Sequence, residues 1–247
     1  MQRYFLDSST TIDKEIEIGG SDFHHIKNVM RMKIGDEVYI CNNKATYLCS
    51  LKCFLEKSVL FSVLEKIEKS SEMKYYVTIA QGVVRREKKE EVIRRITELG
   101  ASKYIPVKME RCVVKNSGDD KLERQKTIIK EASEQSHRSH LMEITPSISF
   151  NDLLNLNKEY DLCLFAYEES GRNDDYHFKS FLKQIKGKEN SKILVVIGPE
   201  GGFSSEEAKK LSLNGFKAIG LGPRILRTET APLYVMSAIS YELELEE

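Results

Sequence analysis

The sequence contains no long hydrophobic run. No apolar stretch reaches the roughly 18 residues that a membrane-spanning helix needs. The N-terminal segment MQRYFLDSSTTIDKE lacks the apolar core of a signal peptide. These absences favour a cytoplasmic protein with no membrane partner. The 247 residues, 40% of them hydrophobic and 31% charged, are enough for one large domain or two ordinary ones with a real core.

Cysteine is sparse and scattered. An odd set of five argues against a disulfide framework; its members are Cys41, Cys49, Cys53, Cys112 and Cys163. Cys49 and Cys53 lie four residues apart in a strand-like segment, but the sequence offers no further ligands beside them for a zinc site. We therefore expect no metal.

The chain also lacks net charge, with 38 basic and 38 acidic residues. The charges are unevenly spread, however, since residues 82–140 carry 15 Lys and Arg against 10 Asp and Glu. A basic segment in a neutral chain indicates a local anionic partner. The alternative is a solvated helix face, which is the commoner origin of a single charge run.

The usual phosphate-binding motifs are missing too. The sequence has no Gly-Lys-Ser/Thr of a P-loop, and its first α/β strand ends in QGVVRRE rather than in a dinucleotide-binding glycine fingerprint. It has no G-x-S-x-G turn of a hydrolase. A phosphate-rich cofactor is therefore disfavoured.

Two different patterns of secondary structure divide the chain. Residues 1–72 contain many short strand-like runs and one helix-like run, SDFHHIKNVMRM, which predicts a small β-barrel domain. Residues 73–247 alternate strands with helices, which predicts a parallel α/β sheet. The helix EKKEEVIRRITEL should end with Gly100 just beyond it.

Two strand-to-helix corners of the second domain are unusually rich in Gly, Arg and Glu. They read IGPEGGFSSEE, with a capping box at Ser204–Glu207, and GLGPRILRTETAPLYVMSAI, in which Thr228 is a candidate cap for the last helix. The carboxyl ends of parallel strands bind ligands, and glycine lets backbone groups approach a flat ligand such as an adenine. Glycine also serves a turn without any ligand, which is the alternative for either corner alone.

The two corners together resemble the signature of the RsmE family, the 16S ribosomal RNA (uracil-N3) methyltransferases of the SPOUT superfamily. The resemblance extends over nearly the whole chain. HHIKNVMRMKIGDEV is similar to the N-terminal PUA-like barrel of that family, and REKKEEVIRRITELGASKYIPV, ERCVVK and EASEQSHR are similar to its middle elements. The chain departs from the family pattern at Arg86, commonly glycine, and at Arg94, usually glutamine.

The resemblance implies a fold and a cofactor. The fold would be a PUA-like β-barrel RNA-binding domain over 1–72. A SPOUT methyltransferase domain over 73–247 would follow, a knotted parallel sheet with helices on both faces and a C-terminal trefoil knot. The cofactor would be S-adenosyl-L-methionine. The residues expected to bind it are Phe165, Ile197, Gly198, Pro199, Glu200, Gly201, Gly202, Leu221, Gly222, Ile225, Leu226, Arg227, Thr230 and Ala231.

The resemblance also implies a reaction and partners. The substrate would be a uridine in the decoding region of 16S rRNA in the assembled small ribosomal subunit, and the protein would be a homodimer. We assign Arg227 to charge stabilisation and Glu229 to orienting the uracil or accepting its N3 proton. The alternative is that Glu229 only caps a helix and Arg227 only pairs with it. Candidate RNA-binding residues are Arg3, Arg31, Arg85, Lys88, Arg111, Lys115 and Arg138.

Three other functions remain open from the sequence. The chain could be a SPOUT methyltransferase with another target, such as a ribose 2′-hydroxyl, or a non-catalytic RNA-binding assembly factor that has kept the fold. It could also be an unrelated small-molecule α/β enzyme, which would not depend on the basic segment. The intact GPEGG and RILRTETA segments argue against the assembly factor.

Overall fold

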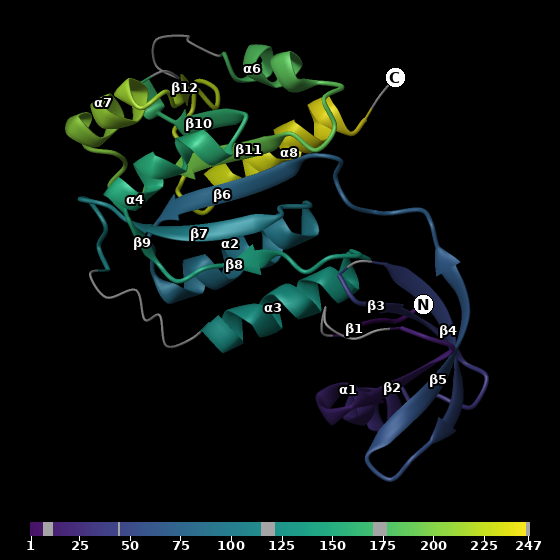
Figure 1. The fold of residues 1–247 in the computed structure, drawn as a ribbon. Helices are drawn as coiled ribbons and strands as arrows, with labels where there is room; N and C mark the ends of the chain where they lie inside the picture. The colour runs from purple at the N-terminus through teal and green to yellow at the C-terminus, as the bar shows by residue number, and fades with distance from the viewer. Residues whose placement is uncertain (7–11, 44, 115–121, 170–176, 246–247) are drawn as a thin grey trace. The chain divides into compact units, whose positions relative to one another are not determined.

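The computed structural model describes residues 1–6, 12–43, 45–114, 122–169 and 177–245. The chain forms two compact units (Figure 1). The first comprises Met1–Glu72 and Ser133–Leu141, and the second comprises Met73–Ala132 and Met142–Glu247. The segment 133–141 therefore packs with the N-terminal unit, although the expected domain limits placed it in the C-terminal one.

The first unit is built on a curled five-stranded sheet with the order β1-β3-β4-β5-β2. Its strands are β1 (Arg3–Phe5), β2 (Glu15–Gly19), β3 (Glu37–Cys41), β4 (Thr46–Phe54) and β5 (Ser58–Ile67). The β1–β3 pair is parallel and the other pairs are antiparallel. In β2, Ile16 and Ile18 are buried while Glu15 and Glu17 face outward, the period of two that a half-buried strand requires.

The expected helical run follows β2 as two short pieces, α1 (Gly20–His24) and a π-helical turn, η1 (His25–Val29). The N–H of Met30 donates to the carbonyl of His25 at 2.9 Å, which closes the wider turn. Ile26 fills the core of the unit, and Val29 and Met30 remain exposed.

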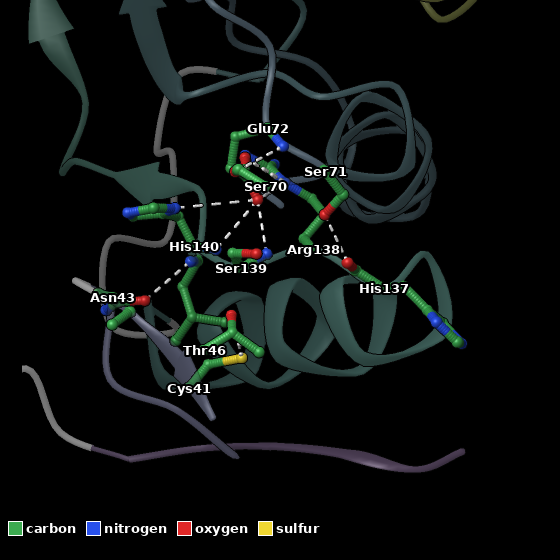
Figure 2. Close-up of polar contacts among 12 residues, drawn as sticks. Cys41, Asn43, Thr46, Ser70, Ser71, Glu72, His137, Arg138, Ser139 and His140 are labelled. Carbon is green, nitrogen blue, oxygen red and sulfur yellow. Dashed lines mark hydrogen bonds and ion pairs between the residues drawn. The ribbon is translucent and has the colours of Figure 1, made fainter. Parts of the chain in front are cut away.

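A polar cluster around Glu72 holds the segment 133–141 in this unit (Figure 2). The Arg138 Nη2 donates to Glu72 Oε2 at 2.6 Å, and the N–H groups of Ser139 and His140 donate to Glu72 Oε1 at 2.6 and 3.0 Å. The Arg3 guanidinium donates to the Arg138 carbonyl at 2.7 Å. The Glu72 carboxylate thus holds the segment 133–141 directly, and strand β1 contacts the same segment through the Arg138 carbonyl.

The second unit is built on a parallel sheet with the order β12-β10-β11-β6-β7-β8, with β9 also paired to β7. Its strands are β6 (Tyr76–Gly82), β7 (Lys103–Lys108), β8 (Glu143–Ile144), β9 (Ile148–Ser149), β10 (Leu162–Ala166), β11 (Lys192–Ile197) and β12 (Lys217–Ile219). Every pairing in this sheet is parallel. This confirms the α/β fold predicted from the sequence.

Helices cover both faces of the parallel sheet (Figure 1). They are α2 (Arg86–Glu98), α3 (Leu122–Gln135), α4 (Phe150–Asn155), α6 (Phe178–Ile185), α7 (Ser205–Leu213) and α8 (Ala231–Leu243), with a 3₁₀ turn, η3 (Leu156–Glu159), after α4. One core joins Leu153 of α4 and Leu211 of α7 to Phe165 and Val196 of the sheet. Helix α8 packs with α2 and α6. Among the described residues, no helix has both the length and the apolar character needed to cross a membrane.

The carboxyl ends of the central strands align in one row. Ile197 of β11 pairs with Gln81 of β6 on one side and with Ala166 of β10 on the other, and Ala166 pairs with Ile219 of β12. Both glycine-rich segments leave the sheet from this row. The topology thus brings together corners that are more than 20 residues apart in the sequence.

Candidate functional site

The first glycine-rich segment forms a tight loop between β11 and α7. The N–H of Gly202 donates to the carbonyl of Pro199 at 2.9 Å, and Gly202 has φ +67°, a conformation that glycine adopts without steric cost. The predicted capping box is confirmed: Glu207 N–H donates to Ser204 Oγ at 3.2 Å, and Ser204 N–H donates to Glu207 Oε2 at 3.0 Å. The loop therefore ends on a fixed helix start.

Gly201 lies against the chain around Arg111. A Cβ on Gly201 would lie 2.9 Å from the Cβ of Arg111 and 3.1 Å from its carbonyl oxygen. The Arg111 guanidinium also donates to the Gly201 carbonyl at 3.2 Å. Glycine is thus needed at this position because the chain around Arg111 lies against the loop. Gly201 is absent from the residues that line the cavity described below.

The second glycine-rich segment connects β12 to α8. Gly222 has φ +103°, and the N–H groups of Thr230 and Ala231 both donate to the carbonyl of Arg227 at 2.9 Å. Helix α8 begins at Ala231 with Thr230 at the N-cap position. The expectation that Thr228 caps this helix is wrong: its hydroxyl donates to the Gly198 carbonyl at 2.7 Å and so joins the two loops.

The loops enclose a cavity of about 370 Å³, within the size range of small-molecule sites. Eleven of the fourteen expected cofactor-binding residues line it: Ile197, Gly198, Pro199, Glu200, Gly202, Leu221, Gly222, Ile225, Leu226, Arg227 and Ala231. Much of this lining is glycine backbone and apolar side chain. Such a surface suits a flat, largely apolar ligand fixed by a few polar contacts.

The end of β10 supplies a third side of the cavity. The expected residue there, Phe165, is only 1% exposed and lies beneath the lining, with its ring 5.8 Å from those of Phe203 and Tyr167. Residues 166–169, which follow Phe165, line the cavity instead. The sequence prediction named Phe165, whereas the lining begins at the next residue, Ala166, where strand β10 ends.

Charged groups of both signs surround the cavity. Arg111, Arg224 and Arg227 line it together with Glu168, Glu169 and Glu200. Of the basic residues, Arg224 was not among the expected site residues, and Arg111 was expected only as an RNA contact. The expected catalytic residue Arg227 is exposed at the cavity.

Glu229, the second expected catalytic residue, lies beside the cavity rather than in its lining. The Lys88 ammonium, on the first turn of α2, is 3.0 Å from Glu229 Oε2 and 3.7 Å from Glu200 Oε1. Burial raises the pKa of Glu229, but its own backbone N–H, Lys88 and Arg227 outweigh burial and lower the pKa below its ordinary value. Glu229 is therefore a carboxylate at neutral pH.

The expected RNA-binding residues occupy different environments. Arg31 and Arg85 are exposed. Arg3 and Arg138 are 8% and 4% exposed and make buried contacts within the first unit, which favours a structural role for both. Lys88 is engaged by two carboxylates, and Lys115 lies outside the described residues.

Comparison with known proteins gives two family matches. Residues 71–240 match the model of an RNA methyltransferase domain, and residues 18–52 match an RNA methyltransferase PUA domain. Within the described part of the chain, no group of three or more His, Cys, Asp or Glu side chains is arranged to hold a metal.

Individual relatives agree with these matches. A Bacillus subtilis protein named ribosomal RNA small subunit methyltransferase E is 39% identical over 252 residues, covering 99% of this chain and 98% of its own. A Legionella pneumophila methyltransferase solved with bound S-adenosylmethionine is 26% identical, covering 97% of this chain and 96% of its own, with a TM-score of 0.81. The Neisseria gonorrhoeae ribosomal RNA small subunit methyltransferase E, solved with S-adenosylmethionine, has the same fold, with a TM-score of 0.83, 24% identity and coverage of 98% and 97%. The chain therefore belongs to the family of ribosomal RNA small subunit methyltransferase E, a group of RNA methyltransferases.

Proposed function

We propose that this protein uses S-adenosylmethionine to methylate N3 of a uridine in the decoding region of 16S rRNA, with the assembled small subunit as substrate. The observation that most supports this proposal is the cavity between the two glycine-rich loops. The family membership supplies the reaction class, and the cavity supplies a site of suitable size for the cofactor. A ribosomal substrate would place the protein in the cytoplasm.

The lining of the cavity fits this cofactor. Gly198, Gly202 and Gly222 expose backbone, and Leu221 and Leu226 offer apolar surface to a flat adenine. The carboxylates of Glu168, Glu169 and Glu200 suit the positive sulfonium and amino groups. When bound, S-adenosylmethionine would supply a methyl group activated for displacement from its sulfonium sulfur.

Side chains at and beside the cavity would help uracil N3 to react with the methyl group. N3 must lose its proton to attack the methyl group, and its pKa lies well above neutral, so a base or a stabilised anion is needed. We assign the exposed Arg227 to stabilising negative charge on the uracil carbonyl oxygens as the proton leaves. Glu229, ionised beside it, is our candidate for orienting the uracil or accepting that proton.

RNA binding is assigned to the exposed basic residues of the expected set, which are Arg31, Arg85 and Arg111. Arg111 also donates to the Gly201 carbonyl beside the cavity. Phosphate contacts by such residues supply affinity but no sequence choice. Because N3 lies on the pairing edge of uracil, the target base must be unpaired or flipped out of a helix.

We also propose that the protein is a homodimer. Three large residues of the C-terminal region, Tyr234, Tyr241 and Leu245, are 45%, 69% and 62% exposed, and Ile225 at the cavity is 66% exposed. An apolar surface of this kind on the last helix and beside the cavity suits a second copy of the chain. Light scattering would measure the mass, and a monomer at micromolar concentration would contradict the proposal.

The reaction is tested with small subunits that lack the modification. They are incubated with the protein and labelled S-adenosylmethionine, and the digested nucleosides are identified by mass spectrometry. We expect 3-methyluridine. A ribose-methylated product would support S-adenosylmethionine as the cofactor but would show that the target is a ribose hydroxyl and not N3 of uracil. Absence of both product and cofactor binding would contradict the proposed activity and favour an assembly factor.

A further inference from the structure

A chain of buried hydrogen bonds runs beneath the cavity through Tyr104, Gln81, Thr228 and Gly198. The Tyr104 hydroxyl donates to Gln81 Oε1 at 3.0 Å. The Gln81 Nε2 donates to the Thr228 carbonyl at 2.7 Å and to Thr228 Oγ1 at 3.0 Å. The Thr228 hydroxyl then donates to the Gly198 carbonyl at 2.7 Å. We call these four residues the Gln81 chain.

Each hydrogen bond in the Gln81 chain has only one possible assignment of donor and acceptor. The Gly198 carbonyl can only accept, so the Thr228 hydroxyl must donate to it and accept from the Gln81 amide. The Gln81 oxygen is then left to accept from Tyr104, whose pKa is raised by burial and which therefore stays a neutral donor. Gln81 and Tyr104 are completely buried and Thr228 is 8% exposed, so an unpaired group here would be costly.

Gln81 occupies the point at which the sheet meets both loops. It lies in the row of strand ends, paired in register with Ile197, the residue before Gly198. Its neighbour Gly82 lies directly beneath Pro199, since a Cβ on Gly82 would be 2.5 Å from the proline Cδ. Strand β6 therefore contacts the first loop through Gly82 and holds the second loop through Gln81.

The two ends of the Gln81 chain differ in their relation to the cavity. Gly198 and Thr228 line it, whereas Gln81 and Tyr104 are not among the lining residues. Gln81 would therefore contact residues that line the cavity but not the proposed ligand itself. Its amide Nε2 donates to two atoms of Thr228 in the second loop. Loss of that amide would free Thr228 to turn away from Gly198, and the spacing between the loops would change.

We propose that Gln81 is a positioning residue that sets the spacing of the two loops and thereby the affinity for S-adenosylmethionine. The inference rests on the proposed function, because it assumes that the cavity binds this cofactor. A purely structural role is the competing explanation, in which the Gln81 chain stabilises the fold without tuning the site. The two roles predict different effects when individual hydrogen bonds of the Gln81 chain are removed. A positioning role changes cofactor affinity, whereas a structural role changes only thermal stability.

The test compares a substitution that removes the hydrogen bonds to the second loop with one that removes a hydrogen bond farther from the loops. Gln81→Met keeps the side-chain length but removes both the bonds to Thr228 and the bond from Tyr104. Tyr104→Phe removes the Tyr104 bond alone and leaves the bonds to Thr228 in place, so the difference between the two variants reports on the loop bonds. Cofactor affinity is measured by calorimetry, thermal stability by scanning calorimetry, and kcat and KM with small subunits. We expect Gln81→Met to weaken cofactor binding about tenfold or more, as the loss of a buried partner implies. Tyr104→Phe should weaken it less than about threefold, and KM for the subunits should change in neither variant.

A second pair of variants covers the case in which Gln81→Met does not fold. Thr228→Val keeps the shape of the side chain and removes the hydroxyl, and Thr228→Ser restores the hydroxyl. We expect the valine variant to lose affinity and the serine variant to recover most of it.

Equal falls in melting temperature for Gln81→Met and Tyr104→Phe, with cofactor affinity unchanged in both, would overturn the proposal in favour of a structural role. Equal cofactor affinity in Thr228→Val and Thr228→Ser would overturn it as well. A wild-type protein that binds no S-adenosylmethionine would contradict the proposed function itself, and the positioning role with it.

Discussion

Arg138 and Glu72 form an ion pair that is almost closed to solvent. The Arg138 Nη2 lies 2.6 Å from Glu72 Oε2, and the two side chains are 5% and 16% exposed. Arg138 lies just after α3, whereas Glu72 ends the N-terminal segment of the same unit. The pair therefore joins a stretch from the middle of the sequence to the β-rich unit that precedes it.

Replacing Arg138 with alanine should destabilise the first unit. The substitution would leave Glu72 buried with two backbone N–H donors but without its counter-charge, and the removal of one partner of a buried pair typically costs about 3 kcal/mol or more. Thermal unfolding by calorimetry measures the change. The matched control is Arg95→Ala, which removes an exposed pair with Glu98 and should cost less than about 1 kcal/mol. Similar losses in both variants would contradict the importance of the Glu72–Arg138 pair.

The same carboxylate gives the first unit an acid sensitivity. Burial raises the pKa of Glu72, but Arg138 and the N–H groups of Ser139 and His140 outweigh burial and lower the pKa below its usual range. The stabilisation is therefore fully present above the ordinary glutamate pKa of about 4.3 and is lost as the pH falls through the lower folded value. We expect Glu72→Gln to be less stable than wild type at neutral pH, with the difference shrinking in acid. A constant difference in unfolding free energy across pH would exclude this linkage.

The local features of the site could be predicted from the sequence because they depend on neighbouring residues. The Ser204–Glu207 capping box, the end of α2 before Gly100 and the parallel sheet follow from short patterns. The two glycine-rich corners could be placed at one edge because parallel strands end there. The knot implied by the family resemblance stays a prediction, and no pattern of hydrophobic residues would reveal it.

The rest of the site depends on contacts between distant residues. In the sequence, Gln81 is a single polar residue in a predicted strand. Only the register of β6 with β11, which pairs Gln81 with Ile197, shows that it lies next to the loops. In the sequence, Arg3 and Arg138 look like surface charges. In the structure both are buried, because Arg3 donates to the Arg138 carbonyl and Arg138 pairs with Glu72. Lys88 likewise belongs to a charged helix in the sequence but meets carboxylates from both loops in the structure.

Gly82→Ala should weaken cofactor binding by moving the first loop. The new Cβ would lie 2.5 Å from Cδ and 2.6 Å from the nitrogen of Pro199, so the loop must shift. The control is Gly19→Ala at the end of another strand, where the nearest atom would be at an ordinary 3.6 Å. We expect a cofactor Kd at least about tenfold higher for Gly82→Ala, measured by calorimetry. An unchanged Kd would show that the position of Pro199 does not matter to the ligand.

Charge reversal at the exposed arginines should weaken binding to the small subunit. Arg31→Glu combined with Arg85→Glu removes two cations from the surface and adds two anions, which phosphate groups would repel. We expect a large loss of subunit affinity, a shallower dependence on salt and unchanged cofactor affinity. Lys57→Glu with Lys69→Glu, two exposed lysines outside the expected set, is the matched control. Equal effects from both pairs would mean that net charge alone, rather than these arginines, governs binding.

Lys88 links the two loops by charge, and its removal should alter the pH dependence of the reaction. Its ammonium lies 3.0 Å from Glu229 and 3.7 Å from Glu200 and helps to lower the pKa of Glu229. Lys88→Met would therefore raise that pKa. If Glu229 must be ionised to assist the uracil, the acid limb of the kcat profile should move to higher pH, because the carboxylate would become protonated sooner as the pH falls.

Lys88→Arg separates this effect from a simple loss of packing. The guanidinium keeps the positive charge between the two carboxylates, so the acid limb should return toward its wild-type position. Glu229→Gln should abolish the pH dependence of that limb while leaving the cofactor bound. If Lys88→Met lowers kcat equally at every pH, Lys88 acts by holding the loops together, and the proton-accepting role assigned to Glu229 loses its support.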